Sequence, residues 1–227
     1  MTTLFLIPST IGASPAESLP APARDVVRGL RDFAVENAKS ARAFLGALGM
    51  PCPMRDIDVR VIGDDADAML EPLRRGRPLG LLSDAGCPGV ADPGQAVVAA
   101  AHASGYRVVP LPGPSALLLA LMASGLEGQR FAFCGYLPRD AEARRQRIAA
   151  LERRSRDQRE TQIFIETPYR NDVLLEALIA HCAPQSRLCV AADLMRASET
   201  ISTRSIADWR RARARVGRRP AVFLLLA

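Results

Sequence analysis

Short apolar stretches alternate with amphipathic stretches through the first half of the chain, and this alternation predicts strands alternating with helices. The expected strands cover Leu4–Ile7, Phe33–Val35, Asp58–Ile62, Leu79–Leu82 and Arg107–Leu111. The expected helices cover Ala23–Arg31, Ser40–Leu48, Ala66–Arg75 and Gln95–His102. Strands that alternate with helices imply a parallel sheet covered on both faces.

The second half has a different pattern. Expected strands at Phe131–Tyr136, Gln162–Glu166, Leu188–Ala192, Thr200–Thr203 and Val222–Leu226 surround arginine-rich helices. The strand at Thr200–Thr203 is followed too closely by the next elements for every link to be a helical crossover, which favours a mixed sheet. Three prolines within Pro110–Pro114 predict a stiff, extended connection. The sequence thus predicts two α/β domains, residues 1–111 and 112–227.

Residues Ser83–Gly94 form the most unusual segment of the first half. These twelve residues hold three Gly, two Pro and two Asp, so they continue neither the strand before them nor the helix after them. They follow the carboxyl end of a buried strand, where open α/β sheets bind ligands. We therefore favour a binding loop over a simple connection. The chain has no G-x-G-x-x-G dinucleotide motif and no P-loop motif.

Charge and composition restrict the possible binding partners and the cellular location of the protein. The formal net charge is +6, and 29 of the 30 basic residues are Arg. Arginines in Arg139–Arg159 are interleaved with acids, as on a solvated helix face, whereas Arg204–Arg219 holds seven Arg against the single Asp208. The second stretch fits either a phosphate-binding surface or a solvated face. Five scattered cysteines, without a C-x-x-C pair, indicate neither a metal site nor disulfides. With no signal peptide and no membrane-length apolar run, we expect a cytoplasmic protein.

Several motifs together carry a resemblance that spans the chain in order. They are the Ser83–Gly94 loop, Val108–Ala116, Gly135–Pro138, Leu6–Gly12, Ile163–Arg170, and Ala191–Leu194 with Glu199–Ile201. The chain resembles the tetrapyrrole methylases, the class III S-adenosylmethionine-dependent methyltransferases, and within them the ribosomal RNA small subunit methyltransferase I family. That resemblance implies methylation of a ribosomal RNA 2′-hydroxyl, with ribosomal RNA or the small subunit as partner. The alternatives are a small-molecule acceptor such as a tetrapyrrole, or a catalytically idle relative that binds cofactor or RNA.

Some positions depart from the family pattern. The acidic Glu-Asp-Thr-Arg run reads Glu36–Lys39, the Arg-Glu-Leu motif reads Ala192–Leu194, and the Gly-Glu before the last strand reads Arg219–Pro220. The chain also ends at Ala227, without the C-terminal helical extension of longer members. The cofactor motifs are nearly intact, so the methyl donor is better defined than the acceptor.

The resemblance places S-adenosylmethionine, without a metal, in the cleft between the two domains. Carried over by position, the cofactor-binding residues are Pro8, Ser83, Asp84, Ala85, Gly86, Val90, Asp92, Ser115, Ala116 and Leu137. Asp84 has an alternative role as a turn residue that caps its own backbone. A hydroxyl acceptor also gains from a general base.

Four carboxylates are candidates for that base, namely Glu36, Glu166, Asp193 and Glu199. We select Glu166 and Asp193 as the catalytic residues. The alternative for Glu166 is an ion pair with Arg170, and Glu199 has the alternative of a surface pair with Arg196.

The segment Ala116–Ala123 bears on assembly. It is apolar on every face, and such a helix must be buried all round. A twofold partner chain would bury it, and class III methyltransferases are commonly dimers, so we expect a homodimer. The alternative is that the helix packs between the two domains.

Overall fold

The computed structural model describes residues 2–227, which divide into two compact units, Met1–Ser115 and Ala116–Ala227. The sequence prediction put the boundary after Leu111, whereas the units divide after Ser115, where the first helix of the second unit begins. Residues 111–115 form no helix or strand, in agreement with the expected extended connection.

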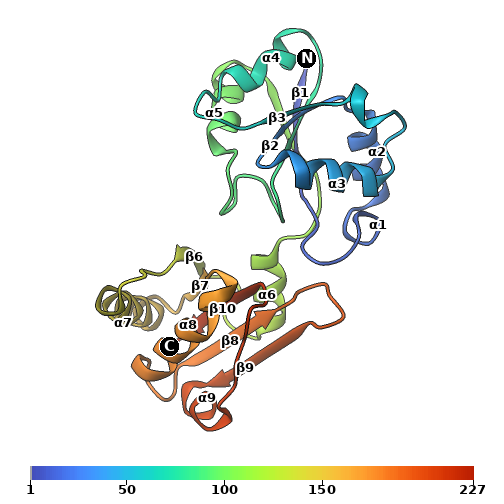
Figure 1. The fold of residues 1–227 in the computed structure, drawn as a ribbon. Coiled ribbons are helices and arrows are strands. Elements are labelled where there is room, and N and C mark those ends of the chain that lie inside the picture. The colour runs from blue at the N-terminus through green and yellow to red at the C-terminus, as the bar shows by residue number, and fades with distance from the viewer. Residues whose placement is uncertain (1) are drawn as a thin grey trace. The chain divides into compact units, whose positions relative to one another are not determined.

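The first unit is a five-stranded parallel sheet covered on both faces (Figure 1). The strand order is β3-β2-β4-β1-β5. Its elements are β1 (Thr3–Ile7), α1 (Pro15–Ser18), α2 (Ala21–Gly29), β2 (Asp32–Val35), α3 (Ala38–Leu48), η1 (Met54–Asp56), β3 (Asp58–Val61), η2 (Ala68–Leu70), α4 (Glu71–Arg74), β4 (Leu79–Leu82), α5 (Gln95–Ala103) and β5 (Arg107–Pro110). Alternating strand residues point to opposite faces. Ile7 therefore joins the core under α1–α3, and Leu4 the core under α4 and α5.

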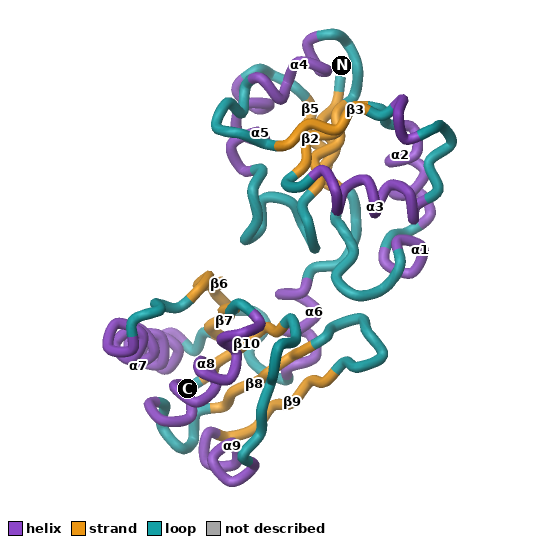
Figure 2. Tube along the Cα trace, in the orientation of Figure 1, coloured by secondary structure: helices purple, strands orange, loops and turns teal. Residues whose placement is uncertain are grey.

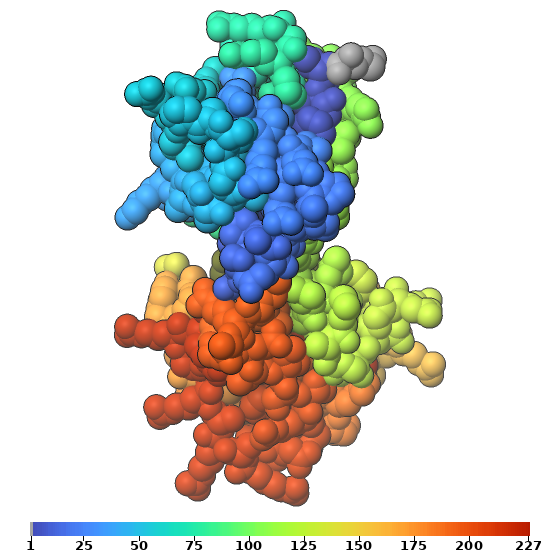
Figure 3. Space-filling model, turned by 90° about the vertical axis from the view of Figure 1, so that its right-hand side faces the viewer, coloured from blue at the N-terminus to red at the C-terminus, as the bar shows by residue number. Residues whose placement is uncertain are grey.

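The second unit is a mixed sheet, as predicted (Figures 1 and 2). Its strand order is β6-β7-β10-β8-β9. Only β6 and β7 are parallel. Its elements are α6 (Ala116–Ser124), β6 (Phe131–Tyr136), α7 (Ala141–Gln158), β7 (Thr161–Ile165), η3 (Pro168–Arg170), α8 (Asn171–His181), β8 (Arg187–Ala192), β9 (Thr200–Ser205), α9 (Ile206–Ala212) and β10 (Ala221–Leu226). The main core lies under α7, α8 and α9, and α6 packs on β8, β9 and β10. Long side chains project into solvent from the orange and red parts of this unit (Figure 3).

A bulge interrupts the edge strand β6. Phe131, Phe133 and Tyr136 stand opposite Thr161, Ile163 and Ile165 of β7, so three residues of β6 span two residues of β7 after Phe133. Gly135 lies within the bulge with φ +66°, a left-handed conformation that glycine adopts readily. The extra residue places Tyr136 on the same sheet face as Phe131 and Phe133, and Leu137 is buried in the main core.

One predicted helix is wrong in its first half. The segment Ala66–Arg75 forms the short 3₁₀ turn η2 and then α4, which starts only at Glu71. Pro72 lies in the first turn of α4 and has no N–H to continue a hydrogen-bond ladder from upstream residues. A regular helix therefore cannot run through this segment.

Candidate functional site

Three segments meet at the carboxyl ends of β1, β4 and β5 in the first unit. Ser9 and Gly86 exchange two backbone hydrogen bonds, of 2.7 and 3.3 Å, which join the turn after β1 to the Ser83–Gly94 loop. The Cys87 thiol donates to the Pro114 carbonyl at 3.5 Å, which joins the loop to the segment after β5. Neighbouring strand ends of a parallel sheet thus bring together residues far apart in sequence, as expected for a ligand site.

Glycines shape the loop. Gly86, Gly89 and Gly94 have φ of +71°, +78° and +129°, a region that residues with a Cβ rarely adopt. A Cβ on Gly86 would meet nothing closer than 3.7 Å, so backbone conformation, and not crowding by this unit, requires glycine there. Gly113 differs, because a Cβ would lie 2.5 Å from Pro8. The Pro8 turn and residues 111–115 therefore pack closely.

Three carboxylates gather at this end of the sheet. The amide of Asp84 donates to the Glu36 carboxylate at 2.9 Å, and the Ser40 hydroxyl donates to the Asp84 carboxylate at 2.5 Å. Burial, followed by the charge of Glu36 and that of Asp84, raises the pKa of Asp92 to about 6, although a hydrogen bond from Ser83 opposes the shift. Among the described residues, no Arg or Lys forms an ion pair with these three acids, which leaves an acidic site on a basic protein.

The altered run Glu36–Lys39 keeps a structural role. Asn37 caps α3 by accepting hydrogen bonds from the amides of Lys39 and Ser40, and Asn serves as well as Asp in that position. The alternative for Asp84 was a turn residue that caps its own backbone, but its hydrogen bonds in the structure are to Glu36 and Ser40.

In the second unit, Glu166 lines a pocket at the carboxyl ends of β6 and β7. The cavity has a volume of about 280 Å³ and is lined by Tyr136, Leu137, Arg139, Glu166, Thr167 and Arg170. The Glu166 side chain is only 2% exposed. Its Oε1 accepts from the amide and the hydroxyl of Thr167, whereas Oε2 lies 3.3 Å from Nη2 of Arg170 without a well-aligned hydrogen bond. The ion pair with Arg170 is therefore present, and Oε2 is buried without a hydrogen-bond partner among the described residues.

Asp193 belongs to a separate network. It follows β8, which β10 separates from β7, so the backbones of the two strands lie roughly 10 Å apart. Its carboxylate accepts from the Ser198 hydroxyl at 3.0 Å and lies 3.8 Å from Arg196. Asp193 and Met195 both have left-handed φ, 55° and 62°, which marks a strained turn.

Glu199 is held within that same turn. Its carboxylate accepts from the Met195 amide at 2.8 Å, so Arg196 pairs with Asp193 and not with Glu199. Glu199 therefore has a structural role in the turn.

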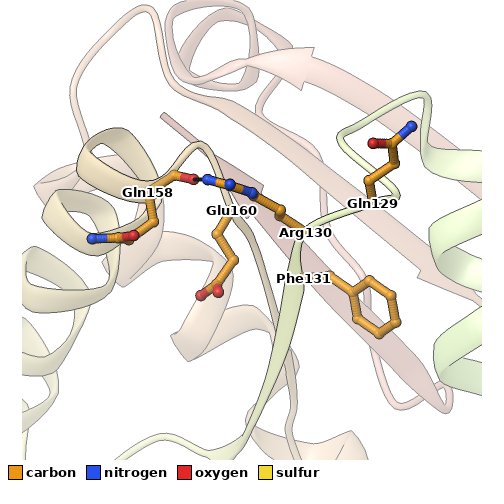
Figure 4. Close-up of a pocket in the computed structure, with 5 residues that line it drawn as sticks. All are labelled: Gln129, Arg130, Phe131, Gln158 and Glu160. Atoms are coloured by element: carbon orange, nitrogen blue, oxygen red, sulfur yellow. Dashed lines mark hydrogen bonds between the residues drawn. The ribbon is translucent and has the colours of Figure 1, made fainter.

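A second pocket of the same unit lies at the opposite end of β6 and β7 (Figure 4). It has a volume of about 390 Å³ and is lined by Gln129, Arg130, Phe131, Gln158 and Glu160. Arg130 donates to the Gln158 carbonyl at 3.2 Å, which ties the start of β6 to the end of α7. Parallel strands bind ligands at their carboxyl ends, so the Glu166 pocket is the better candidate.

The predicted site residues fall into two groups. Pro8, Ser83, Asp84, Ala85, Gly86, Val90, Asp92 and Ser115 belong to the first unit, and Ala116, Leu137, Glu166 and Asp193 to the second. Ser83 is buried, and Val90 is 46% exposed. The sequence analysis missed Arg139 as a lining residue and Gly113 as the packing partner of Pro8. For the packing of Gly113 on Pro8, the one indication in the sequence was the proline-rich segment around Gly113. The sequence held no indication for Arg139.

Metal-ligating clusters and membrane-length helices are both absent from the part of the chain that the structure describes. Within residues 2–227, no group of three or more His, Cys, Asp or Glu side chains is placed to hold a metal ion. No helix in the same range has the length and apolar character needed to cross a membrane.

Comparison with known proteins identifies the family. The profile described as Tetrapyrrole (Corrin/Porphyrin) Methylases matches residues 21–209. Ribosomal RNA small subunit methyltransferase I of Xylella fastidiosa is 34% identical over 199 residues, which cover 88% of this chain and 71% of that protein. The protein of the same name from Pseudomonas aeruginosa is 33% identical over 213 residues, 91% of this chain and 72% of that protein.

Solved structures agree on the fold. Diphthine synthase superposes with a TM-score of 0.69 at 16% identity, covering 100% of this chain and 90% of that chain. The methyltransferase CobJ superposes with a TM-score of 0.64 at 20% identity, covering 99% and 93%. The chain therefore belongs to the tetrapyrrole methylase family, in the group of the ribosomal RNA small subunit methyltransferase I proteins.

Proposed function

We propose that this protein transfers a methyl group from S-adenosylmethionine to the 2′-oxygen of a ribosomal RNA nucleotide. The observation that carries the proposal is the 33–34% identity, over most of the chain, to proteins named ribosomal RNA small subunit methyltransferase I. The solved methyltransferases named for uroporphyrin-III and for cobalt precorrin-4 share the fold at only 18% and 13% identity.

The first unit fits the proposed methyl donor. S-adenosylmethionine supplies a methyl group on a positively charged sulfonium, next to a cationic amine. Glu36, Asp84 and Asp92 form an acidic cluster without a cationic partner among the described residues, which suits such a ligand. The bare backbone around Gly86 supplies donors and acceptors for its polar groups. We assign Pro8, Ser83–Gly86, Val90, Asp92 and Ser115 to this subsite. The expected contribution of Ala116 and Leu137 to the same subsite stays a prediction.

The Glu166 pocket fits the acceptor. A 2′-hydroxyl must lose its proton as its oxygen forms the new bond to the methyl carbon. We assign this proton to Oε2 of Glu166, which has no hydrogen-bond partner among the described residues and lies 3.3 Å from Nη2 of Arg170. The cavity of about 280 Å³ suits a part of one nucleotide better than a macrocycle of four pyrroles. Asp193 is the second candidate for the base.

The test is transfer of a labelled methyl group to small ribosomal subunits, to free 16S ribosomal RNA and to tetrapyrrole precursors. The proposal expects label in the RNA, at a nucleotide whose 2′-position becomes resistant to alkaline cleavage. Label in a tetrapyrrole would overturn the RNA assignment. Calorimetry with S-adenosylmethionine and its demethylated product should show one site per chain. Binding without transfer to any acceptor would support the idle relative.

We also propose that the active protein is a homodimer, on the evidence of α6. The helix is apolar all round, yet Met122 is 79% exposed in the single chain. A side chain of this kind is a candidate for burial against a second copy.

A further inference from the structure

The seven arginines of Arg204–Arg219 divide into two groups in the structure. Four are engaged by the second unit itself. Arg204 lies over the Trp209 ring at 5.1 Å, Arg210 donates to the carbonyls of Ile179 and Cys182, Arg211 pairs with Asp208 at 3.2 Å, and Arg219 donates to Val216 and Thr200. These four arginines hold the fold together or are neutralised locally.

The other three are Arg213, Arg215 and Arg218. All three are exposed, and none has a hydrogen bond or ion pair with any described residue. Between them, Val216 is buried in the main core, so the backbone of the loop is fixed to the unit. We call residues 213–219 the arginine loop.

Two residues at the start of α8 hold the arginine loop in place. Asn171 is fully buried, and its Nδ2 donates to the carbonyls of Gly217 and Arg219 at 3.1 and 2.7 Å. Oδ1 of Asp172 accepts from the amides of Val216 and Gly217 at 2.7 and 3.1 Å. A loop fixed by four such bonds presents its arginines in a set arrangement, which lowers the ordering cost of binding a ligand.

The path of the loop leads to the candidate acceptor site. It leaves α9, passes along α8 and reaches β10 (Figure 2). It begins where Arg213 and Arg215 line a groove of about 390 Å³ beside α8, with Glu176 as the one acid in the lining. The residue that follows the loop is Pro220, whose carbonyl accepts from the amide of Asp193. Its anchor Asn171 directly follows Arg170, which lines the Glu166 pocket.

The arginines of α7 provide a contrast within the same unit. Arg145 pairs with Glu142, Arg154 with Glu160, and Arg156 with Glu152, at distances from 2.5 to 4.0 Å. These charges are compensated locally. Arg213 also occupies the left-handed C-cap of α9, with φ 44°, where glycine is usual. The chain thus keeps an uncompensated arginine at a position that favours another residue.

We infer that Arg213, Arg215 and Arg218 bind successive phosphates of an RNA strand and guide it toward the Glu166 pocket. Guanidinium groups match phosphate oxygens in geometry and charge. The inference rests on the proposed function, because it takes the acceptor to be RNA.

The experiment measures binding of a 16S ribosomal RNA fragment, and of small subunits, over a range of salt concentrations. Each lost phosphate contact reduces the slope of log affinity against log salt by about 0.7 for single-stranded RNA. The variant R213Q/R215Q/R218Q should therefore lose about 2 units of slope and bind at least ten-fold more weakly at low salt. The matched control R145Q/R154Q/R156Q removes the same charge from α7 and should keep the slope.

Two further variants keep the result interpretable. The variant R215Q/R218Q keeps Arg213 at its left-handed position, so it controls for misfolding of the triple variant. Its reduction of the slope should be about two thirds of the reduction in the triple variant. R213K/R215K/R218K keeps the charge and should retain most of the slope. An equal loss in the α7 control, or an unchanged slope in the triple variant, overturns the inference.

Methyl transfer by the wild-type protein to small subunits is measured in parallel. If transfer to RNA occurs while the slope stays unchanged, only the arginine loop assignment fails. If the wild-type protein neither binds nor methylates RNA, the proposed function fails as well.

Discussion

The Glu36 carboxylate accepts a hydrogen bond of 2.9 Å from the backbone amide of Asp84, which ties the end of β2 to the loop that follows β4. Removing the acceptor with Glu36→Ala should destabilise the protein by about 1 kcal/mol, because an exposed hydrogen bond contributes about 0.5–1.5 kcal/mol. It should also weaken S-adenosylmethionine binding, since the loop loses its anchor and the site loses a charge. Denaturant unfolding and calorimetry measure the two effects. Glu36→Gln keeps an acceptor and should retain stability while still losing affinity; equal affinity for Glu36→Gln and the wild-type protein would contradict the charge contribution.

Gly86 tests the loop as a binding surface. Gly86→Val forces a side chain into φ +71°, at a cost of about 1–3 kcal/mol. Gly105 is a matched control, because it has φ +73°, has no atom within 4 Å of the place that a Cβ would take, and follows α5 away from the loop. Gly86→Val and Gly105→Val should lose similar stability in denaturant unfolding. Only Gly86→Val should lose cofactor binding, and retained binding in that variant would remove the loop from the site.

The pKa of Asp92, raised to about 6 from 3.8, predicts a pH dependence of cofactor affinity. Above about pH 6 the carboxylate is charged and attracts the cationic ligand, so affinity should rise between about pH 5 and pH 7. The folded state binds more protons than the unfolded state between these pKa values, so this group's contribution to stability falls as the pH rises through about 6. Asp92→Asn should flatten both trends. A wild-type affinity that is constant across this range would count against Asp92 in the site.

Glu166 and Asp193 can be separated by kinetics. If Glu166 is the general base, Glu166→Gln should lower kcat by about 10²–10⁴-fold and leave the cofactor affinity unchanged. Glu142→Gln, on the exposed surface of α7, is the control and should retain activity. A large kcat loss in Asp193→Asn, with a small one in Glu166→Gln, would transfer the role to Asp193.

Assembly is checked by light scattering at micromolar concentration. A homodimer should give twice the single-chain mass of 24.5 kDa. Met122→Glu places a charge on the exposed face of α6 and should shift the mass toward 24.5 kDa. Val61→Glu alters an exposed apolar residue of the first unit and should leave the dimer intact. A wild-type mass of 24.5 kDa would refute the dimer.

The periodicity of the sequence predicted both sheets, because their inner strands are mostly buried and read directly as apolar runs. These inner strands are β1, β2 and β4 of the first sheet and β7, β8 and β10 of the second. It failed at Ala66–Arg75, where Pro72 breaks a pattern that is otherwise helical. The Ser83–Gly94 loop was predictable because its glycines and prolines have local conformational causes. The bonds from Asn171 to Gly217 and Arg219 were not predictable, because they join positions more than forty residues apart. For the same reason, the sequence did not distinguish the engaged arginines of Arg204–Arg219 from the unpaired ones.

The bulge in β6 preserves the wall of the Glu166 pocket although the strand carries one additional residue. Because strand residues alternate between faces, a regular β6 of the same length would turn Tyr136 to the core face and Leu137 to the opposite one. Deleting Gly135 would instead leave a regular strand in which the tyrosine still stands opposite Ile165, on the face of Phe131 and Phe133. The bulge therefore absorbs a single insertion, and a relative that lacks this residue would present the same phenol to the acceptor.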